Sequence, residues 1–151
     1  SLYQYFPNTE AVIFEVYREM LGRVRDVLDE FDSLDRLSLS REQFFAELNE
    51  SMVAVGPEAD VVIAMHHAVK IYPLLTEADR EHGELIAKRL GKFLKHFGSS
   101  WPLAKLERLA LYAYYVDHGT WIYRDHVKPP KEEADAWEHS ILNHVFSICF
   151  D

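Results

Sequence analysis

The stretch IFEVYREMLGRVRDVLDEF, residues 13–31, spaces its apolar side chains by alternating steps of four and three positions. This spacing places them on one face of an α-helix, because the helix completes a turn every 3.6 residues. The face consists of Ile13, Tyr17, Met20, Val24, Val27 and Phe31, and Phe14, Leu21 and Leu28 widen it. We therefore expect one long amphipathic helix over residues 9–31, with Gly22 as its one soft point.

All six prolines lie where the apolar periodicity stops, so they mark helix boundaries rather than kinks. Between them the spacing predicts helices from a capping box at residues 40–43 to Gly56, and over residues 58–72, 76–98, 102–127 and 131–150. No segment alternates as a strand does. The sequence thus predicts an all-α protein, a bundle of about six helices, with residues 32–39 as its longest loop.

Length and composition indicate one folded domain, because 151 residues with 48% hydrophobic content can bury a sizeable core. The longest apolar runs are much shorter than the ~20 residues that span a bilayer, so no membrane segment is expected and the predicted location is the cytoplasm. The single cysteine, Cys149, has no internal disulfide partner and lies among apolar neighbours. The formal net charge of -9 makes the chain as given a poor binder of nucleic acid.

Two of the expected helices are too apolar for a single buried face. Residues 109–116 contain no polar side chain apart from tyrosine hydroxyls, and the last helix carries a similar excess. Either these helices are central in the chain or a second subunit covers them. For a homodimer, the interface residues would be Leu109, Ala113, Trp137, Ile141, Val145 and Ile148.

At LYQYFPNTEAV, residues 2–12, aromatic side chains stand directly before a Pro-Asn helix stop and the start of the long helix. This pattern resembles the tetracycline-repressor (TetR) family of bacterial transcription regulators, in which it closes a helix-turn-helix. The resemblance in motif covers only residues 1 to about 12, while the later helices agree with the family's all-helical C-terminal regulatory domain only in number and order.

The resemblance implies that residues 1–8 are the remnant of a helix-turn-helix domain and that residues 9–151 form a ligand-binding and dimerisation domain. It places Tyr3, Gln4, Tyr5 and Thr9 at operator DNA. Thr9 stands where the family commonly has a lysine, so a phosphate contact there loses its charge. Half a helix-turn-helix cannot hold the reading geometry, and we expect no specific DNA binding by this chain alone.

Neither a metal site nor a catalytic site is predicted, and no cofactor is expected. His66 and His67 point about 100° apart on a helix, and Asp79-x-x-His82 has no second partner motif. Asp29, Asp32 and Asp35 step by three and lack the glycine of a calcium loop. The chain also lacks a nucleophile elbow and a phosphate-binding glycine loop, so no enzyme is expected.

An aromatic-rich helical interior remains as the candidate site. Its residues are Phe45, Met65, His66, Val69, Tyr72, Tyr112, Tyr115 and His118. Polar-tipped aromatics around an apolar space suit a small-molecule site, and they also suit an ordinary core. The resemblance favours the pocket, which implies a repressor that an apolar or aromatic effector releases from its operator.

Two alternatives from other classes stay open. One is a metal or ligand carrier, or a small helical enzyme, whose first helix only mimics the motif. The other is a helical protein-interaction module whose partner covers the apolar excess of the last two helices.

Overall fold

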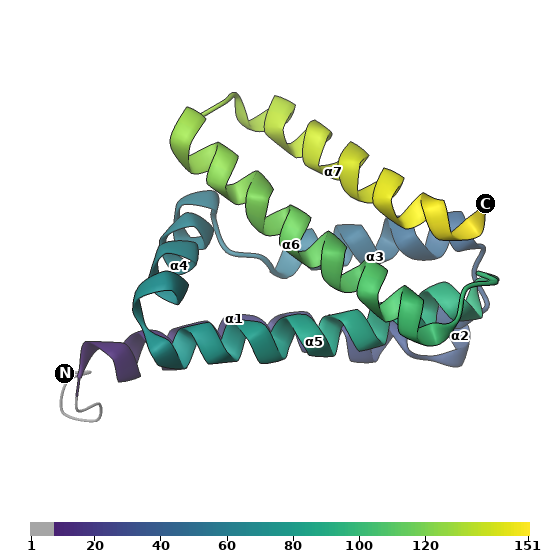
Figure 1. Ribbon diagram of the computed structural model, residues 1–151, viewed down its shortest axis with the longest axis horizontal. Helices are drawn as coiled ribbons and strands as arrows, with labels where there is room; N and C mark the ends of the chain where they lie inside the picture. Colours follow the sequence, from purple (N-terminus) through teal and green to yellow (C-terminus); the bar gives the residue numbers. More distant parts are fainter. Residues whose placement is uncertain (1–7) are drawn as a thin grey trace. The chain divides into compact units, whose positions relative to one another are not determined.

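The computed structural model describes residues 8–151, and over this range the chain is entirely helical, with no strand (Figure 1). Its elements are α1 (Thr9–Phe31), α2 (Leu34–Leu37), α3 (Arg41–Val55), α4 (Ala59–Ile71), α5 (Pro73–His96), α6 (Leu103–Val127), α7 (Lys131–Ser147) and the 3-10 helix η2 (Ile148–Phe150). The expected all-α class is confirmed. The described range contains seven α-helices, where the sequence predicted about six.

The first two predicted helix starts are confirmed in position, and the start of α3 is also confirmed in its cause, the cap at Ser40. The side chain of Asn8 accepts a hydrogen bond from the amide of Ala11 at 2.8 Å and thereby caps α1. Ser40 accepts from the amide of Gln43 at 3.2 Å and caps α3 in the same way. Each cap satisfies an amide that has no partner within its helix, which fixes where the helix begins.

The segment predicted as a loop, residues 32–39, contains the additional short helix α2. Ser33 caps it, and Arg36 holds it by binding Glu30 at 2.8 Å and Glu47 at 2.5 Å. The guanidinium of Arg36 also lies 4.4 Å from the ring centre of Phe31. Side chains of the neighbouring helices therefore stabilise a turn that four residues could not maintain alone.

Two other boundaries differ from the prediction by a few residues. The helix expected from Thr76 begins three residues earlier at Pro73, because proline suits the first helical position, where its missing amide hydrogen costs nothing. The last helix ends at Ser147 and continues as η2 rather than as α-helix. α6 stops at Lys128, which takes a left-handed conformation with φ of 53° directly before the proline pair.

Contacts divide the chain into two compact units, with the boundary between His82 and Gly83 inside α5. In the N-terminal unit, which ends at His82, α1 packs against α3. The rings of Phe31 and Phe44 meet edge to face with centres 5.5 Å apart, and both side chains are fully buried. The C-terminal end of the predicted apolar face of α1 therefore forms core, as its spacing indicated.

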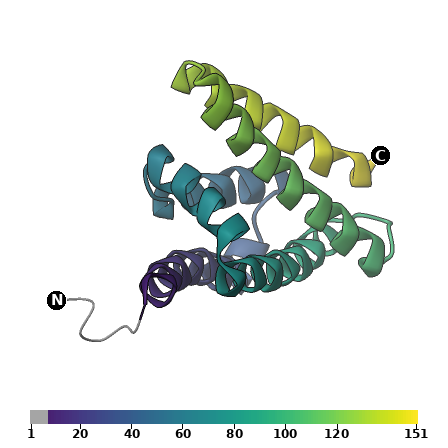
Figure 2. The same ribbon diagram turned by 60° about the vertical axis from the view of Figure 1, so that its left-hand side comes forward.

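In the C-terminal unit, from Gly83 to Asp151, α6 packs against α7, and Figures 1 and 2 show the two helices as adjacent antiparallel rods. A methyl group on Gly83 would lie 2.7 Å from the ring of Tyr114. Gly91 likewise faces Glu107, whose backbone nitrogen would be 3.2 Å away. The missing side chains let α5 approach α6 closely.

Candidate functional site

In the N-terminal unit, a buried hydrogen bond joins α1 to the first part of α5. The hydroxyl of Tyr17 on α1 donates to Oδ1 of Asp79 on α5 at 2.9 Å, and both residues are buried. Burial raises the pKa of Tyr17 far above its usual value, and the charge of Asp79 and the hydrogen bond to it raise the pKa further. Tyr17 therefore remains a neutral donor to a carboxylate in the interior.

A second contact ties the beginning of α1 to the beginning of α5. Oε1 of Glu10 accepts a hydrogen bond from the backbone amide of Leu74 at 3.1 Å. Leu74 is the second residue of α5, where amides lack acceptors within the helix and the helix dipole favours a negative charge. Together with Tyr17, Glu10 fixes how α1 lies along the first turns of α5 (Figure 2).

A group of ion pairs joins α6 to α7 near their proline connection. Arg124 on α6 is only 9% exposed, and its two terminal nitrogens bind different residues of α7. Nη2 lies 2.7 Å from Oε2 of Glu138, and Nη1 lies 2.9 Å from Oδ1 of Asp135. Lys131 also binds Asp135, and the hydrogen bonds from Lys131 and Arg124 hold the pKa of Asp135 below its usual value.

Asp117 is on α6, two helical turns before Arg124. Burial raises the pKa of Asp117 to about 7, and the charge of Glu138 and the hydrogen bond to it act in the same direction. The interactions with His118 and Arg124 oppose this rise without cancelling it. Asp117, Arg124, Asp135 and Glu138 thus form one connected group, which we call the α6–α7 polar cluster.

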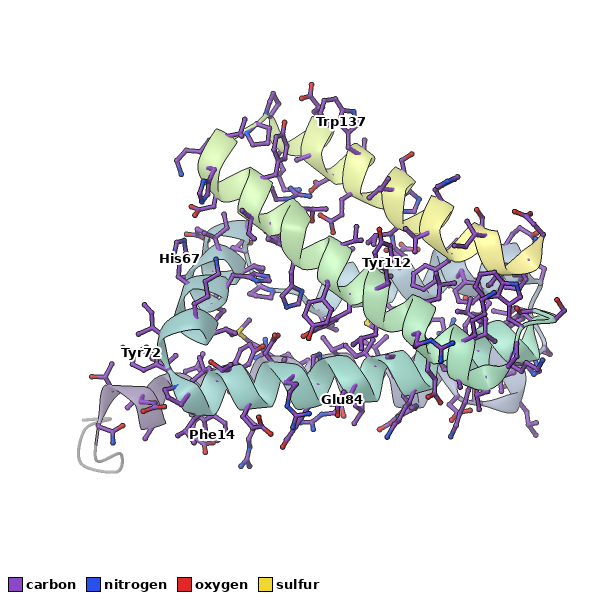
Figure 3. All side chains as sticks on the ribbon, in the orientation of Figure 1. Phe14, His67, Tyr72, Glu84, Tyr112 and Trp137 are labelled. Atoms are coloured by element: carbon purple, nitrogen blue, oxygen red, sulfur yellow. The ribbon has the colours of Figure 1, made fainter. Side chains whose placement is uncertain are left out.

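The residues predicted to line an effector site divide between the two units. In the N-terminal unit, Phe45 is half-buried with its ring edge to face against Phe44, the centres 5.2 Å apart. The other four members are on or directly after α4 and are half-buried: Met65, His66, Val69 and Tyr72. No residue of α4 is fully buried, although its sequence is the most apolar of the long helices. Figure 3 labels His67 and Tyr72 in this segment.

In the C-terminal unit, the three remaining effector-site candidates are on α6. Tyr112 and Tyr115 are 62% and 51% exposed, so their rings lie largely outside the core. His118 is half-buried with its ring centre 4.4 Å from that of Tyr114, and its Nδ1 lies 2.8 Å from the carbonyl oxygen of Tyr114. Tyr114, which the sequence analysis did not select, is thus the aromatic partner that holds His118.

Three of the four predicted DNA contacts, Tyr3, Gln4 and Tyr5, lie outside the described residues. The fourth, Thr9, is the first residue of α1 and is exposed. It directly follows the capping residue Asn8, so the described helix begins where the aromatic motif ends.

The six residues predicted at a dimer interface fall into two groups. Leu109, Ala113 and Val145 are buried within the chain, so a single chain already covers their side chains. Trp137, Ile141 and Ile148 are exposed along α7 and η2. Trp137 is 58% exposed, and Figure 3 labels it on α7. Of the six, only the exposed group is therefore available to a second subunit.

Within residues 8–151, no three or more histidine, cysteine, aspartate or glutamate side chains are grouped as a metal site would require. None of the helices in this range combines the length and the apolar character needed to cross a membrane. No protein-family model matches the chain, and neither a curated protein nor a solved structure gives a significant match to it.

The sequence analysis did not identify the α6–α7 polar cluster, although the sequence contains a signal for it. Asp117 and Arg124 are seven positions apart and so share one face of the same helix. Asp135 and Glu138 are three apart on the next helix and also share a face. Charged residues on matching faces of two helices joined by a short connection predict a bridge between them.

Proposed function

We propose that this chain is the regulatory part of a TetR-like transcription regulator, in which α1 links a DNA-reading domain to a helical effector domain. The observation that supports this most strongly is the position of Asn8. Asn8 ends the aromatic motif LYQYFPN and caps α1, so the motif is followed at once by a helix of 23 residues. A rod in this position can transmit a displacement to the segment that precedes it.

The contacts of α1 support the proposed transmission. Glu10 and Tyr17 attach α1 to the first turns of α5, and α3 packs against α1. A ligand that favours one arrangement of α3, α4 and α5 over another would therefore bias the position of α1. In this proposal the ligand is apolar or aromatic and contacts Phe45 and the half-buried face of α4.

The proposed regulator acts as a homodimer. The exposed apolar side chains Trp137, Ile141 and Ile148 on α7 and η2 are the surface that a second copy would cover. A dimer is required in this proposal because two reading helices must face successive turns of DNA, about 34 Å apart.

The test is a selection from random duplexes of about 30 base pairs, using the protein translated from the complete natural gene. The expected result is a palindromic consensus. The double variant Tyr3→Ala, Tyr5→Ala should bind the selected duplex more weakly and melt at the same temperature. The control variant Tyr123→Ala, which changes a tyrosine on α6 far along the sequence, should keep its affinity. If no consensus sequence emerges from the complete protein, the proposal is wrong.

The second candidate function is a helical protein-interaction module, which the same exposed side chains of α7 favour. It predicts that the complete protein selects no DNA sequence but forms a complex that substitution of Trp137 abolishes. The DNA selection therefore separates the two functions. No catalytic role is proposed in either case.

A further inference from the structure

We propose that the end of the C-terminal unit where α5 meets α6 docks on an anionic phospholipid surface. The docking side chains are cations of both helices together with Leu103, which is exposed and lies between them in the sequence. All of them belong to the C-terminal unit. The inference does not rest on the proposed function in transcription.

Charge is strongly segregated along the chain. Residues 85–108 contain six of the 16 lysine and arginine residues but only one of the 25 aspartate and glutamate residues, Glu107. Six positive charges and one negative charge give this segment a formal charge of +5, whereas the rest of the chain has ten and 24, or -14. The net charge of -9 therefore conceals one segment that attracts anions.

Helical spacing places these cations on exposed faces of the two helices. Lys88, Lys92 and Lys95 are four and three positions apart, so they share one face of α5, and all three are exposed. Lys105 and Arg108, three positions apart, share a face of α6 and are also exposed. We call these five side chains the α5–α6 basic surface.

Trp101, in the connection between α5 and α6, holds two of the ammonium groups near each other. Nζ of Lys95 donates to the carbonyl oxygens of Ser99 at 3.2 Å and of Trp101 at 3.0 Å. Nζ of Lys105 lies 3.6 Å from the centre of the Trp101 ring. Cations of both helices therefore meet where α5 turns into α6, at the end of α6 that is opposite its proline connection to α7 (Figure 1).

The helix dipole accounts for only some of these cations. Lysines near the C-terminal end of α5 are favourable, because the dipole is negative at that end. Lys105 is instead in the first turn of α6, where the dipole is positive and the cap residue Pro102 provides no side-chain hydrogen bond. In the described part of the chain, no ion pair joins Lys105 or Arg108 to a carboxylate. Their charges thus remain available to an external anion.

Apolar side chains beside the cations favour a lipid surface over other polyanions. Leu103 begins α6 and is 39% exposed, and Trp101 is half-buried. The boundary between headgroups and acyl chains accepts leucine and indole side chains, while anionic headgroups attract the neighbouring ammonium groups. The phosphate backbone of a nucleic acid offers Leu103 no apolar partner, and Lys105 already covers one face of the indole on which a base would stack.

Negative charges near the surface limit the strength of this contact. Glu107 is half-buried beside the cations, and the bond from Ser99 to the carbonyl oxygen of Cys149 brings Asp151 near the same connection. Each lysine or arginine close to an anionic membrane strengthens binding about fivefold, and salt screens this attraction. We therefore expect reversible binding at low ionic strength that declines as salt is added.

The test is co-sedimentation of the 151-residue chain with vesicles of phosphatidylcholine and phosphatidylglycerol in equal parts, at low ionic strength. The wild type should bind these vesicles, should not bind vesicles of phosphatidylcholine alone, and should be released by salt. Failure of the wild type to bind the mixed vesicles would overturn the proposal. Binding to duplex DNA but not to the vesicles would also overturn it and would identify the partner as a nucleic acid.

Two double variants separate the basic surface from the net charge. Lys92→Gln with Arg108→Gln should weaken binding to the mixed vesicles by at least about tenfold. Arg25→Gln with Lys70→Gln changes the net charge equally at exposed positions of the N-terminal unit and should bind almost as the wild type does. Equal losses in the two double variants would mean that the α5–α6 basic surface is not the docking site.

Leu103→Ser tests the apolar part of the contact and keeps every charge. It should weaken vesicle binding while leaving the melting temperature unchanged, because Leu103 is partly exposed in the first turn of α6. Melting temperatures of the double variants should also equal that of the wild type, which shows that each protein is folded. Unchanged vesicle binding by Leu103→Ser would contradict insertion at the lipid boundary.

Discussion

The hydroxyl of Tyr17 and the carboxylate of Asp79 are 62 positions apart in the sequence and form a buried hydrogen bond of 2.9 Å. An interior carboxylate is costly unless donors replace the water that it has lost. The pair therefore fixes the alignment of α1 and α5 as well as the distance between them. It requires α1 and α5 to lie in one register, because sliding either helix by a residue would separate the two groups.

Replacing Tyr17 by phenylalanine removes one donor to the buried carboxylate and preserves the ring. We expect Tyr17→Phe to lower the free energy of unfolding by about 1–3 kcal/mol, measured by urea denaturation. Tyr112→Phe is the matched control, since Tyr112 is exposed, and it should change the free energy by less than about 0.5 kcal/mol. Equal values for the two variants would show that the hydrogen bond does not stabilise the fold.

Replacing Gly22 or Gly83 by alanine should change the free energy of unfolding in opposite directions. A methyl group at Gly22 would meet only Nη2 of Arg25 at 4.0 Å, so the glycine serves no close packing in the chain. Gly22→Ala should raise the free energy of unfolding by about 0.5–1 kcal/mol. Gly83→Ala should lower it by about 1–3 kcal/mol, because the ring of Tyr114 must move. Thermal melting measures both changes in stability. A loss of stability in Gly22→Ala would contradict the conclusion that Gly22 makes no close packing contact.

Arg124 should contribute far more to stability than an exposed arginine. Arg124→Met keeps the length of the side chain but leaves Glu138 and Asp135 without their shared cation, at a cost of about 2–3 kcal/mol. Arg23, which pairs with Glu19 at 2.9 Å on the exposed side of α1, supplies the control. Arg23→Met should cost less than about 1 kcal/mol. Similar decreases in the free energy of unfolding for the two variants, measured with denaturant, would mean that the ion pairs of Arg124 do not stabilise the packing of α6 against α7.

A substitution at Ile141 tests whether the exposed face of α7 is a dimer interface. It is 45% exposed, so a charge there should be tolerated by the single chain. If two copies meet on this face, Ile141→Glu should convert the protein to monomer in analytical ultracentrifugation without lowering its melting temperature below that of the dissociated wild type. Ile71→Glu, at a 69% exposed position on α4, should leave the association unchanged. A wild type that sediments as a monomer at micromolar concentration would disprove the interface.

Local signals were sufficient to predict the long helices. Asn8, Ser40 and the prolines act on residues within one turn of themselves, so their effects can be read from sequence alone. α2 could not be predicted, because its four residues depend on Arg36 reaching Glu30 and Glu47 on two other helices. The start of α5 was predicted at Thr76 instead of Pro73, because Thr76 and Asp79 also match a capping pattern.

The charged groups of the fold were harder to predict than its helices. Tyr17 was expected in the core, but its partner Asp79 lies on a helix whose register against α1 no sequence pattern specifies. Arg124 and Glu138 likewise meet only because α6 and α7 pack in one particular alignment. The proposed effector residues and DNA contacts remain predictions.

A hydrogen bond links the end of the C-terminal unit to the connection between α5 and α6: the hydroxyl of Ser99 donates to the carbonyl oxygen of Cys149 at 2.7 Å, 50 positions later. Closing a flexible loop of that length costs about 3.5 kcal/mol of chain entropy, whereas a single hydrogen bond returns about 1 kcal/mol. The bond therefore cannot drive the closure. It depends on the packing of α6 against α7, so we expect amide exchange around Ser99 to be slow only while that helix pair stays packed.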